Sequence, residues 1–219
     1  MASTKHYFTG DAGDSPGLRQ VTLRWRGMTI PWATAPGTFA SGRLDEGTCI
    51  LLDAARFTPG QWLLDLGCGS GALGLFPHLV SEGLTSVLVD INPTAVRCAR
   101  ANARGLGVDR ALVVHGHAAT AVLPGRFDVA LINPPIRAGR KVVEEILWGA
   151  LSSLRPGGSI YLVARVRQGG WTLATLLGRR LGQEPQLISR RKGYLVFHGV
   201  KSSKGHPNYE PKDVAAAGT

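Results

Sequence analysis

The chain has 219 residues, of which 44% are hydrophobic, so it is long enough to bury one substantial core. Residues 1–10 lack an apolar signal core, and no apolar run approaches the roughly 20 residues that cross a bilayer, so we expect a cytoplasmic protein without membrane spans. The three cysteines lack C-x-x-C spacing, which predicts neither a metal site nor disulfides. The formal net charge of +10 favours a partner rich in phosphate, such as nucleic acid, although biased arginine usage could produce the same excess without a ligand.

The first sixty residues predict a small β-hairpin followed by a helix. Alternating apolar and polar residues over 21–33, interrupted by Arg26-Gly27, predict two short strands around a turn. Residues 36–42 have loop composition, and residues 45–56 predict a helix that ends before Thr58-Pro59-Gly60. We expect residues 1–60 to form an extension that packs on the same domain as the rest of the chain.

From residue 62 onward, apolar runs of strand length alternate with helical segments, a pattern typical of a parallel sheet covered on both faces. The expected strands lie at 62–66, 86–90, 112–115, 127–132 and 159–164, and the expected helices at 72–81, 93–104, 141–154 and 171–181. Two further strands, at 186–191 and 194–199, meet at Lys192-Gly193 and predict an antiparallel hairpin at the sheet edge.

The resulting prediction is an α/β fold of the Rossmann-like kind, with a seven-strand, mostly parallel sheet, helices on both faces and one antiparallel edge hairpin strand. Residues 61–200 form the main domain in this interpretation. Residues 201–219 have almost no apolar bulk, so we expect a disordered tail.

Three alternating glycines, Gly67, Gly69 and Gly71, directly follow the first strand of the main domain. Glycines here allow a sharp turn and a close approach of the backbone to a ligand, while the next helix presents free N–H groups. Asp90 ends the following strand, at a distance suited to binding a ribose diol. The same loop fits a relaxed dinucleotide fingerprint through Gly67, Gly69 and Ala72, so the glycines alone leave the nucleotide open.

Asp65, just before the glycines, discriminates between the candidate ligands. A carboxylate at this place suits the cationic methionine end of S-adenosylmethionine and repels a pyrophosphate. Asp65 therefore favours a methyl donor over a nicotinamide dinucleotide.

The segment Asn133-Pro134-Pro135-Ile136 follows the fourth strand of the main domain, where an open parallel sheet places its binding crevice. The Asn133 side-chain oxygen and the Pro134 carbonyl are two acceptors that could hold the hydrogens of an exocyclic amine, and the prolines keep the turn rigid. An ordinary Asn-Pro turn is the alternative. Together with the glycine loop, the segment predicts an N-methyltransferase.

Other polar residues give weaker indications. Arg137, Arg140 and Lys141 lie next to the amine pocket and could position RNA phosphates, or could simply be the solvated start of a helix. His115 and His117 alternate along a strand end, but no third ligand accompanies them, so no metal site is predicted.

These motifs resemble those of class I methyltransferases, and over residues 6–200 the chain is similar to the bacterial 16S (small-subunit) ribosomal RNA guanine-N2 methyltransferases. The resemblance rests on Pro36-Gly37-Thr38-Phe39 through Leu44-Asp45-Glu46-Gly47-Thr48, on Asn133 through Lys141, and on Arg190-Arg191-Lys192-Gly193-Tyr194. It implies S-adenosyl-L-methionine as cofactor and ribosomal RNA or the small ribosomal subunit as partner.

The resemblance also implies roles for individual residues. The cofactor set is Asp65, Gly67, Cys68, Gly69, Gly71, Asp90 and Ile91, with His117 and Ala118 beside the adenine and Gly47, Thr48 and Asn133 toward the methionine end. Phe39, Asp45, Gly47 and Thr48 would line the methionine end or the entrance for the target base, and Phe39, Arg137, Arg140 and Lys141 would meet the RNA.

The chain departs from the family pattern at three places. Ile136 stands where many amine methyltransferases have an aromatic residue that stacks on the target base. His117-Ala118 stands where an acidic residue often binds the adenine amine. Residues 1–60 are too short for the additional N-terminal domain of the larger family members.

The sequence thus predicts methyl transfer to a guanine N2 amine in small-subunit ribosomal RNA. Three alternatives stay open: methylation of a protein glutamine, methylation of an adenine N6, and a non-catalytic RNA-binding module that keeps the fold.

Overall fold

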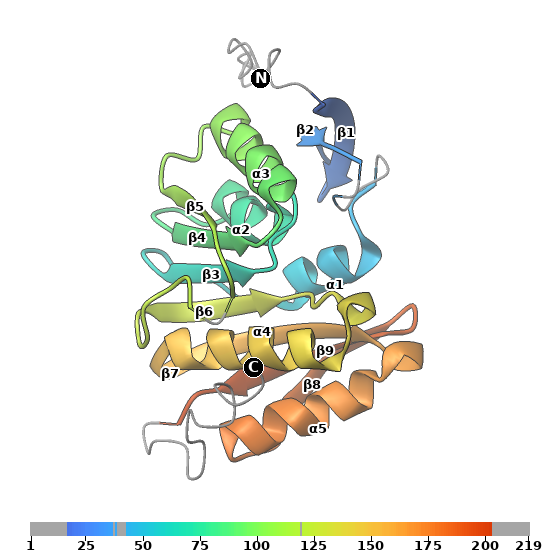
Figure 1. Ribbon diagram of the computed structural model, residues 1–219, viewed down its shortest axis with the longest axis vertical. Coiled ribbons are helices and arrows are strands. Elements are labelled where there is room, and N and C mark those ends of the chain that lie inside the picture. Colours follow the sequence, from blue (N-terminus) through green and yellow to red (C-terminus); the bar gives the residue numbers. More distant parts are fainter. Residues whose placement is uncertain (1–16, 37, 39–42, 119, 203–219) are drawn as a thin grey trace, which may run out of the picture.

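The computed structural model describes residues 17–36, 38, 43–118 and 120–202. Phe39 and nearly all of the expected C-terminal tail lie outside the described residues. The described part forms a central twisted sheet with helices on both faces and a separate two-stranded hairpin near the N-terminal end (Figure 1). None of its helices is both long and apolar enough to cross a membrane.

Seven strands make up the central sheet within the described residues. They are β3 (Trp62–Leu66), β4 (Thr85–Asp90), β5 (Ala111–His115), β6 (Phe127–Ile132), β7 (Leu154–Arg165), β8 (Gln186–Arg191) and β9 (Tyr194–Val200). Their spatial order is β5-β4-β3-β6-β7-β9-β8, and only the pairs that include β9 are antiparallel. The predicted mixed sheet with an antiparallel edge hairpin is confirmed.

Helices cover both faces of this sheet (Figure 1). The α-helices are α1 (Glu46–Ala54), α2 (Ala72–Leu75), α3 (Pro93–Gly105), α4 (Arg140–Ser153) and α5 (Gly170–Leu181), and the short 3-10 helices are η1 (Phe76–Leu79), η2 (Ile136–Ala138) and η3 (Val166–Gln168). Because neighbouring strand residues point to opposite faces, Leu63 packs with α1, α2 and α3, whereas Leu64 packs with α4 and α5.

Two predicted boundaries are wrong, one for a local reason and the other because of pairing with a distant strand. The helix expected at 72–81 is α-helical only to Leu75 and continues as the 3-10 helix η1, which has Pro77 in its first turn and so lacks one backbone donor. Strand β7 begins at Leu154 instead of residue 159, because Leu154 pairs with Phe127 and the Gly157 N–H donates to the Lys201 carbonyl.

The N-terminal hairpin consists of β1 (Arg19–Trp25) and β2 (Met28–Thr34), paired in antiparallel register. It is fastened to α3 and to the glycine loop by buried polar contacts. The Asn102 side chain of α3 accepts the Ala33 N–H at 2.6 Å and donates to the carbonyls of Ala33 and Ser70, and the Trp32 indole N–H donates to the Ser70 hydroxyl at 2.9 Å. The hairpin therefore buttresses the glycine loop from behind.

Candidate active site

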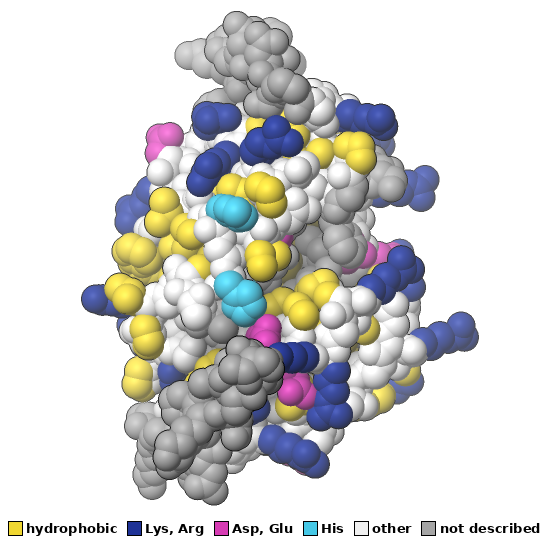
Figure 2. Space-filling model, viewed as in Figure 1, with side chains coloured by type: hydrophobic (Ala, Val, Ile, Leu, Met, Phe, Trp, Pro, Cys, Tyr) yellow, Lys and Arg dark blue, Asp and Glu magenta, His cyan; other side chains and the backbone are white. Residues whose placement is uncertain are grey.

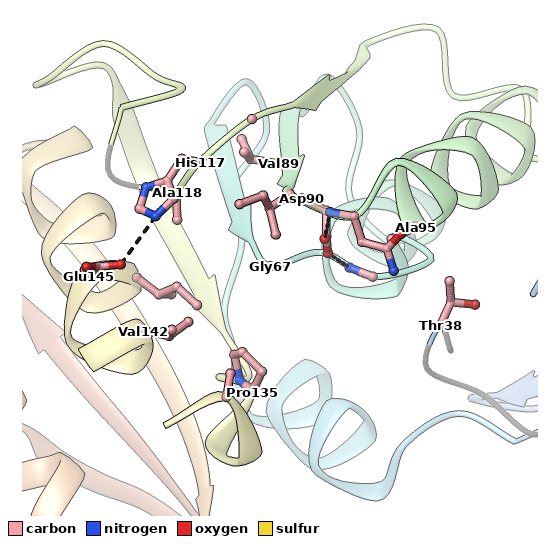
Figure 3. Close-up of a pocket in the computed structure, with 16 residues that line it drawn as sticks. Thr38, Gly67, Val89, Asp90, Ala95, His117, Ala118, Pro135, Val142 and Glu145 are labelled. Atoms are coloured by element: carbon pink, nitrogen blue, oxygen red, sulfur yellow. Dashed lines mark hydrogen bonds and ion pairs between the residues drawn. The ribbon is translucent and has the colours of Figure 1, made fainter. Parts of the chain in front are cut away.

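A first cavity of about 410 Å³ opens beside the carboxyl ends of β3, β4 and β5 (Figure 3). Six of the predicted cofactor residues line it: Gly67, Gly69, Asp90, Ile91, His117 and Ala118. The others do not: Asp65, Cys68, Gly71, Gly47, Thr48 and Asn133. The carboxyl ends of parallel strands are where open α/β sheets bind ligands, as the sequence predicted.

The glycine loop combines two functions. Gly67 and Gly69 have φ values of 73° and 55°, and they form part of the cavity wall with backbone atoms only. Gly71, at φ 96°, is the N-cap of α2 and faces the protein interior, where a Cβ would meet Leu88 at 3.0 Å and Ala99 at 3.2 Å. The third glycine is thus required by packing, and the first two leave room for a ligand.

Asp90 holds the loop and faces the cavity. Its Oδ2 accepts the Gly69 N–H and its Oδ1 accepts the Asn92 N–H, both at 2.8 Å. Each carboxylate oxygen can accept more than one hydrogen bond, so both remain able to bind a ribose diol. The next side chain, Ile91, is apolar yet 66% exposed at the rim, as expected for a surface that a flat ligand covers.

Asp65 has a different place from the one expected. Its side chain is buried, and its Oδ2 accepts the Gly74 N–H of α2 at 2.9 Å beneath the loop. Burial raises the pKa of this carboxyl group from 3.8 to about 8, and the charge of Asp90 adds to the shift. Burial therefore favours the neutral form of Asp65, and its side chain does not line the cavity.

An acidic side chain reaches the part of the first cavity that His117 and Ala118 line, from an element that the sequence did not single out. Glu145 of α4 lines the cavity and lies 3.3 Å from the His117 Nε2 (Figure 3). The sequence left the partner of an adenine amine open, because Ala118 follows His117. The Glu145 carboxylate could accept a hydrogen bond from such an amine. The sequence could not predict that Glu145 faces the cavity, because α4 carries both acidic and basic side chains.

A second cavity, of about 400 Å³, lies on the other side of the Asn133 turn. Its lining consists of Asp45, Asn133, Pro134, Pro135, Ile136, Arg137, Val163, Ala164, Arg165, Gln168 and Tyr194. Pro135 also lines the first cavity, so the two spaces adjoin at this residue. The four residues predicted to receive an amine therefore sit together, next to the predicted cofactor site.

The orientation of the Asn133 amide is fixed by helix α1. Its Nδ2 donates to Asp45 Oδ2 at 2.8 Å and to Thr48 Oγ1 at 3.0 Å. The same Asp45 oxygen caps α1 by accepting the Thr48 N–H at 3.0 Å. Because both donors of the Asn133 amide group are directed to α1, its Oδ1 is the atom left to accept a hydrogen bond from a ligand.

The backbone of the turn supplies the second acceptor. The Pro134 carbonyl accepts the Ile136 N–H at 2.9 Å, and Pro135 has φ −75° and ψ 81°, which is the geometry of an inverse γ-turn. A carbonyl oxygen has two lone pairs, so one remains for a ligand. The turn is rigid because the proline ring fixes φ at its centre.

Gly47 and Thr48 do not line the first cavity, and they contact residues that line the second cavity. A Cβ on Gly47 would lie 2.8 Å from the Tyr194 ring, so this position must lack a side chain for Tyr194 to pack there. Thr48 is buried and holds Asn133 as described. Both residues thus lie behind Asn133 and Tyr194, which line the second cavity.

The three basic residues predicted to meet RNA differ in their surroundings. Arg137 lines the second cavity. Arg140 is paired with Glu144 at 2.6 Å one helical turn away, and Lys141 is exposed on α4. In the part of the chain that the structure describes, no group of three or more His, Cys, Asp or Glu side chains could hold a metal ion.

Comparison with known proteins gives a family match over most of the chain. The family model described as methyltransferase small domain matches residues 29–198, from inside the hairpin to the last strand of the sheet. The match includes both cavities.

Similar proteins differ in how much of their length the chain covers. The Bacillus subtilis protein YbxB, named as uncharacterized, is 26% identical over 90% of this chain and 99% of its own length. The Streptomyces avermitilis ribosomal RNA large subunit methyltransferase G is 30% identical over 78% of this chain and 45% of its own. The solved structure of the T. thermophilus 16S rRNA N2 G1207 methyltransferase in complex with AdoMet and guanosine superposes with a TM-score of 0.74 at 25% identity, covering 85% of this chain and 51% of that one. The chain thus spans about half the length of these two ribosomal RNA methyltransferases.

Proposed function

The chain belongs to the methyltransferase small domain family and has the class I methyltransferase fold, and on that premise we propose that it methylates the exocyclic N2 amine of a guanine in ribosomal RNA, with S-adenosylmethionine as donor. The observation that carries the proposal is the pair of adjoining cavities that share Pro135, one with nucleotide-binding features and the other with two hydrogen-bond acceptors.

The first cavity fits the donor. The backbone at Gly67 and Gly69 offers a close approach, Asp90 faces the place of a ribose diol, and Ile91 and Glu145 supply an apolar surface and an acceptor for an adenine. S-adenosylmethionine supplies an electrophilic methyl group on its sulfonium. In this proposal the methyl group lies beside Pro135, where the first cavity adjoins the second.

The second cavity holds the nucleophile. An exocyclic amine shares its lone pair with the base ring, so it becomes reactive when its hydrogens are held and the pair is turned toward the methyl group. The Asn133 Oδ1 and the Pro134 carbonyl are the two acceptors for those hydrogens. Catalysis then depends on positioning, which a rigid, hydrogen-bonded turn provides.

Guanine and ribosomal RNA are supported by the relatives and by charge. The T. thermophilus protein of similar fold is named as a 16S rRNA N2 methyltransferase and its structure contains guanosine. The net charge of +10 suits an RNA partner. The Streptomyces relative is named for the large subunit, so large-subunit RNA is the second candidate substrate.

One assay tests the proposal as a whole. Wild-type protein is incubated with isotopically labelled S-adenosylmethionine and, separately, with unmodified small- and large-subunit ribosomal RNA, assembled subunits and a translation release factor, and the modified residue is identified by mass spectrometry. We expect N2-methylguanosine in ribosomal RNA. N6-methyladenosine or methylglutamine would replace our assignment by one of the alternatives, and RNA binding without cofactor binding would indicate a non-catalytic module.

The Asn133→Ala variant tests the assigned acceptor. We expect methyl transfer to fall by at least about a hundredfold, because losing one preorganised hydrogen-bonding group at a reacting centre has effects of this size. The dissociation constant for S-adenosylmethionine, measured by calorimetry, should stay within about twofold. Gln168→Ala is the matched control, since Gln168 lines the same cavity but has no assigned contact with the amine. Full activity in Asn133→Ala would remove Asn133 from the site.

A further inference from the structure

The wall of the second cavity contains an arginine stacked on a tyrosine. Arg165 ends β7 and Tyr194 begins β9, and the two residues are paired across the antiparallel ladder. The Arg165 Cζ lies 4.7 Å from the centre of the Tyr194 ring, and its Nε donates to the Tyr194 Oη at 2.7 Å. The guanidinium plane is thus held in one orientation by two contacts with the same side chain.

Only the arginine of this pair offers a free face. Tyr194 is 6% exposed, with its ring packed against Gly47 on one side and covered by Arg165. Arg165 is exposed and lines the cavity together with Asn133 and Ile136. Arg165 is therefore the more accessible member of the pair at the cavity.

The rest of the cavity lacks an aromatic platform. Among the described residues that line it, Tyr194 is the sole aromatic side chain, and Ile136 occupies the place after the two prolines. Hydrogen bonds from its amine to Asn133 hold a base along one edge only. The two flat faces of the base then contact water or aliphatic groups unless a planar group stacks on one of them. Guanidinium planes stack on nucleobases as aromatic rings do.

We propose that Arg165, oriented by Tyr194, is the stacking platform for the target base and takes the role that Ile136 cannot perform. The inference rests on the proposed function, since it assigns a further residue to the same base pocket. Arg165 is a specificity-determining residue that touches the base, and Tyr194 is a positioning residue that acts through Arg165.

The rival role for an exposed arginine at this place is a contact with an RNA phosphate. Guanosine, which carries no phosphate, separates the two roles. We would measure its affinity for protein saturated with S-adenosylhomocysteine by ligand-observed NMR titration, using wild-type protein and the variants Arg165→Ala, Arg165→Lys and Tyr194→Phe. Arg167→Ala is the control, because Arg167 is an exposed arginine two residues along that does not line the cavity.

We expect both Arg165 variants to bind guanosine about tenfold more weakly, a loss typical of one base-stacking contact, since lysine keeps the charge but has no plane. Tyr194→Phe keeps the ring but loses the hydrogen bond to Arg165, so a smaller loss of about threefold is expected. The Arg167 variant should bind as the wild type does. Melting temperatures and S-adenosylmethionine affinities close to wild type would show that the variants fold.

The same variants are then assayed for methyl transfer to the RNA that the wild type modifies. Unchanged guanosine affinity in Arg165→Ala, or full recovery in Arg165→Lys, would overturn the stacking role while leaving the proposed function intact. A wild-type protein that neither binds guanosine nor methylates RNA would instead end the proposed function, and the platform with it.

Discussion

One oxygen of Asp45 serves both a helix and the candidate active site. It caps α1 through the Thr48 N–H and also accepts from the Asn133 amide. The start of α1 and the turn after β6 are therefore coupled although they are 88 residues apart in the chain. Asp45→Ala removes both contacts, whereas Asp45→Asn keeps a side chain that caps helices equally well.

This pair of variants should separate stability from activity. We expect Asp45→Ala to lose about 1 kcal/mol of unfolding free energy, the usual value of an N-cap, together with most of its methyl transfer. Asp45→Asn should melt within about 2 °C of wild type and retain part of its activity, since a neutral acceptor holds Asn133 less firmly. Denaturant unfolding and steady-state kinetics measure the two effects. Wild-type activity in Asp45→Ala would show that Asn133 needs no support from α1.

Asp65 makes stability depend on pH. Burial holds its pKa at about 8 in the folded protein, compared with 3.8 ordinarily. Between these values the folded state keeps a proton that the unfolded chain releases, so the contribution of Asp65 to stability is complete below about pH 4 and is lost as pH rises to about 8. The free energy of unfolding should therefore decline over this range.

Asp65→Asn should flatten that decline, because an amide can accept the Gly74 N–H without titrating. The measurement is urea unfolding at half-unit steps from pH 5 to pH 8.5. Asp109→Asn, which removes an exposed carboxylate, controls for the change in net charge. Equal slopes in the wild type and Asp65→Asn would mean that the carboxyl group ionises normally in the folded protein.

At the level of single residues, local sequence pattern was sufficient to predict the cavity-lining residues that lie at strand ends. Gly67, Gly69 and Asp90 were predicted from their positions at strand ends and do line a cavity. The contacts on which the proposed roles of Glu145 and Arg165 rest could not be predicted, because their partners come from distant strands and turns. Asp65 lies beneath the glycine loop and not in the cavity wall, because sequence position does not reveal burial.

The Asn102 side chain of α3 links the N-terminal hairpin to the glycine loop. Asn102 is 3% exposed and satisfies both backbone groups of Ala33 as well as the Ser70 carbonyl in the glycine loop. We propose that residues 1–60 belong to the same folding unit as the sheet for this reason. The family match, which begins at residue 29 within the hairpin, is consistent with that proposal.

Asn102→Ala should destabilise the protein by about 2 to 4 kcal/mol, because it leaves several buried backbone groups without partners. S-adenosylmethionine affinity should also fall, since the glycine loop loses its support from behind. Calorimetric melting and binding measure these effects. Arg104→Ala, an exposed change on the same helix, should alter stability by less than about 0.5 kcal/mol. A stable Asn102→Ala variant would show that hydrophobic packing alone holds the hairpin.

Most elements could be predicted because their hydrophobic patterns are local. Strand β6 has the predicted bounds, and α3, α5 and β8 agree within one residue at each end. The wrong boundaries have physical causes. Pro77 lies in the first turn of the 3-10 helix that follows α2. Residues before 159 belong to β7 because Leu154 pairs with Phe127, and a pairing between distant residues cannot be predicted from local sequence.

The charge of the whole molecule should control RNA binding but not cofactor binding. Lys and Arg side chains are spread over both halves of the face in Figure 2, with few acidic side chains between them, and the net charge is +10. Binding of a polyanion releases counterions, so affinity for ribosomal RNA should fall by at least about tenfold between 50 and 200 mM salt. S-adenosylmethionine affinity should change by less than twofold. Filter binding and calorimetry at matched salt test this, and salt-independent RNA binding would contradict it.

The proline shared by the two cavities has a consequence for inhibitor design. Because the cavities adjoin at Pro135, an adenosine analogue and a guanine joined by a short tether could occupy both spaces at once. Such a bisubstrate compound would gain affinity from the high effective concentration of its second half. A nucleotide-binding protein that lacks an adjoining base pocket would recognise only one end, so the tether itself would confer selectivity.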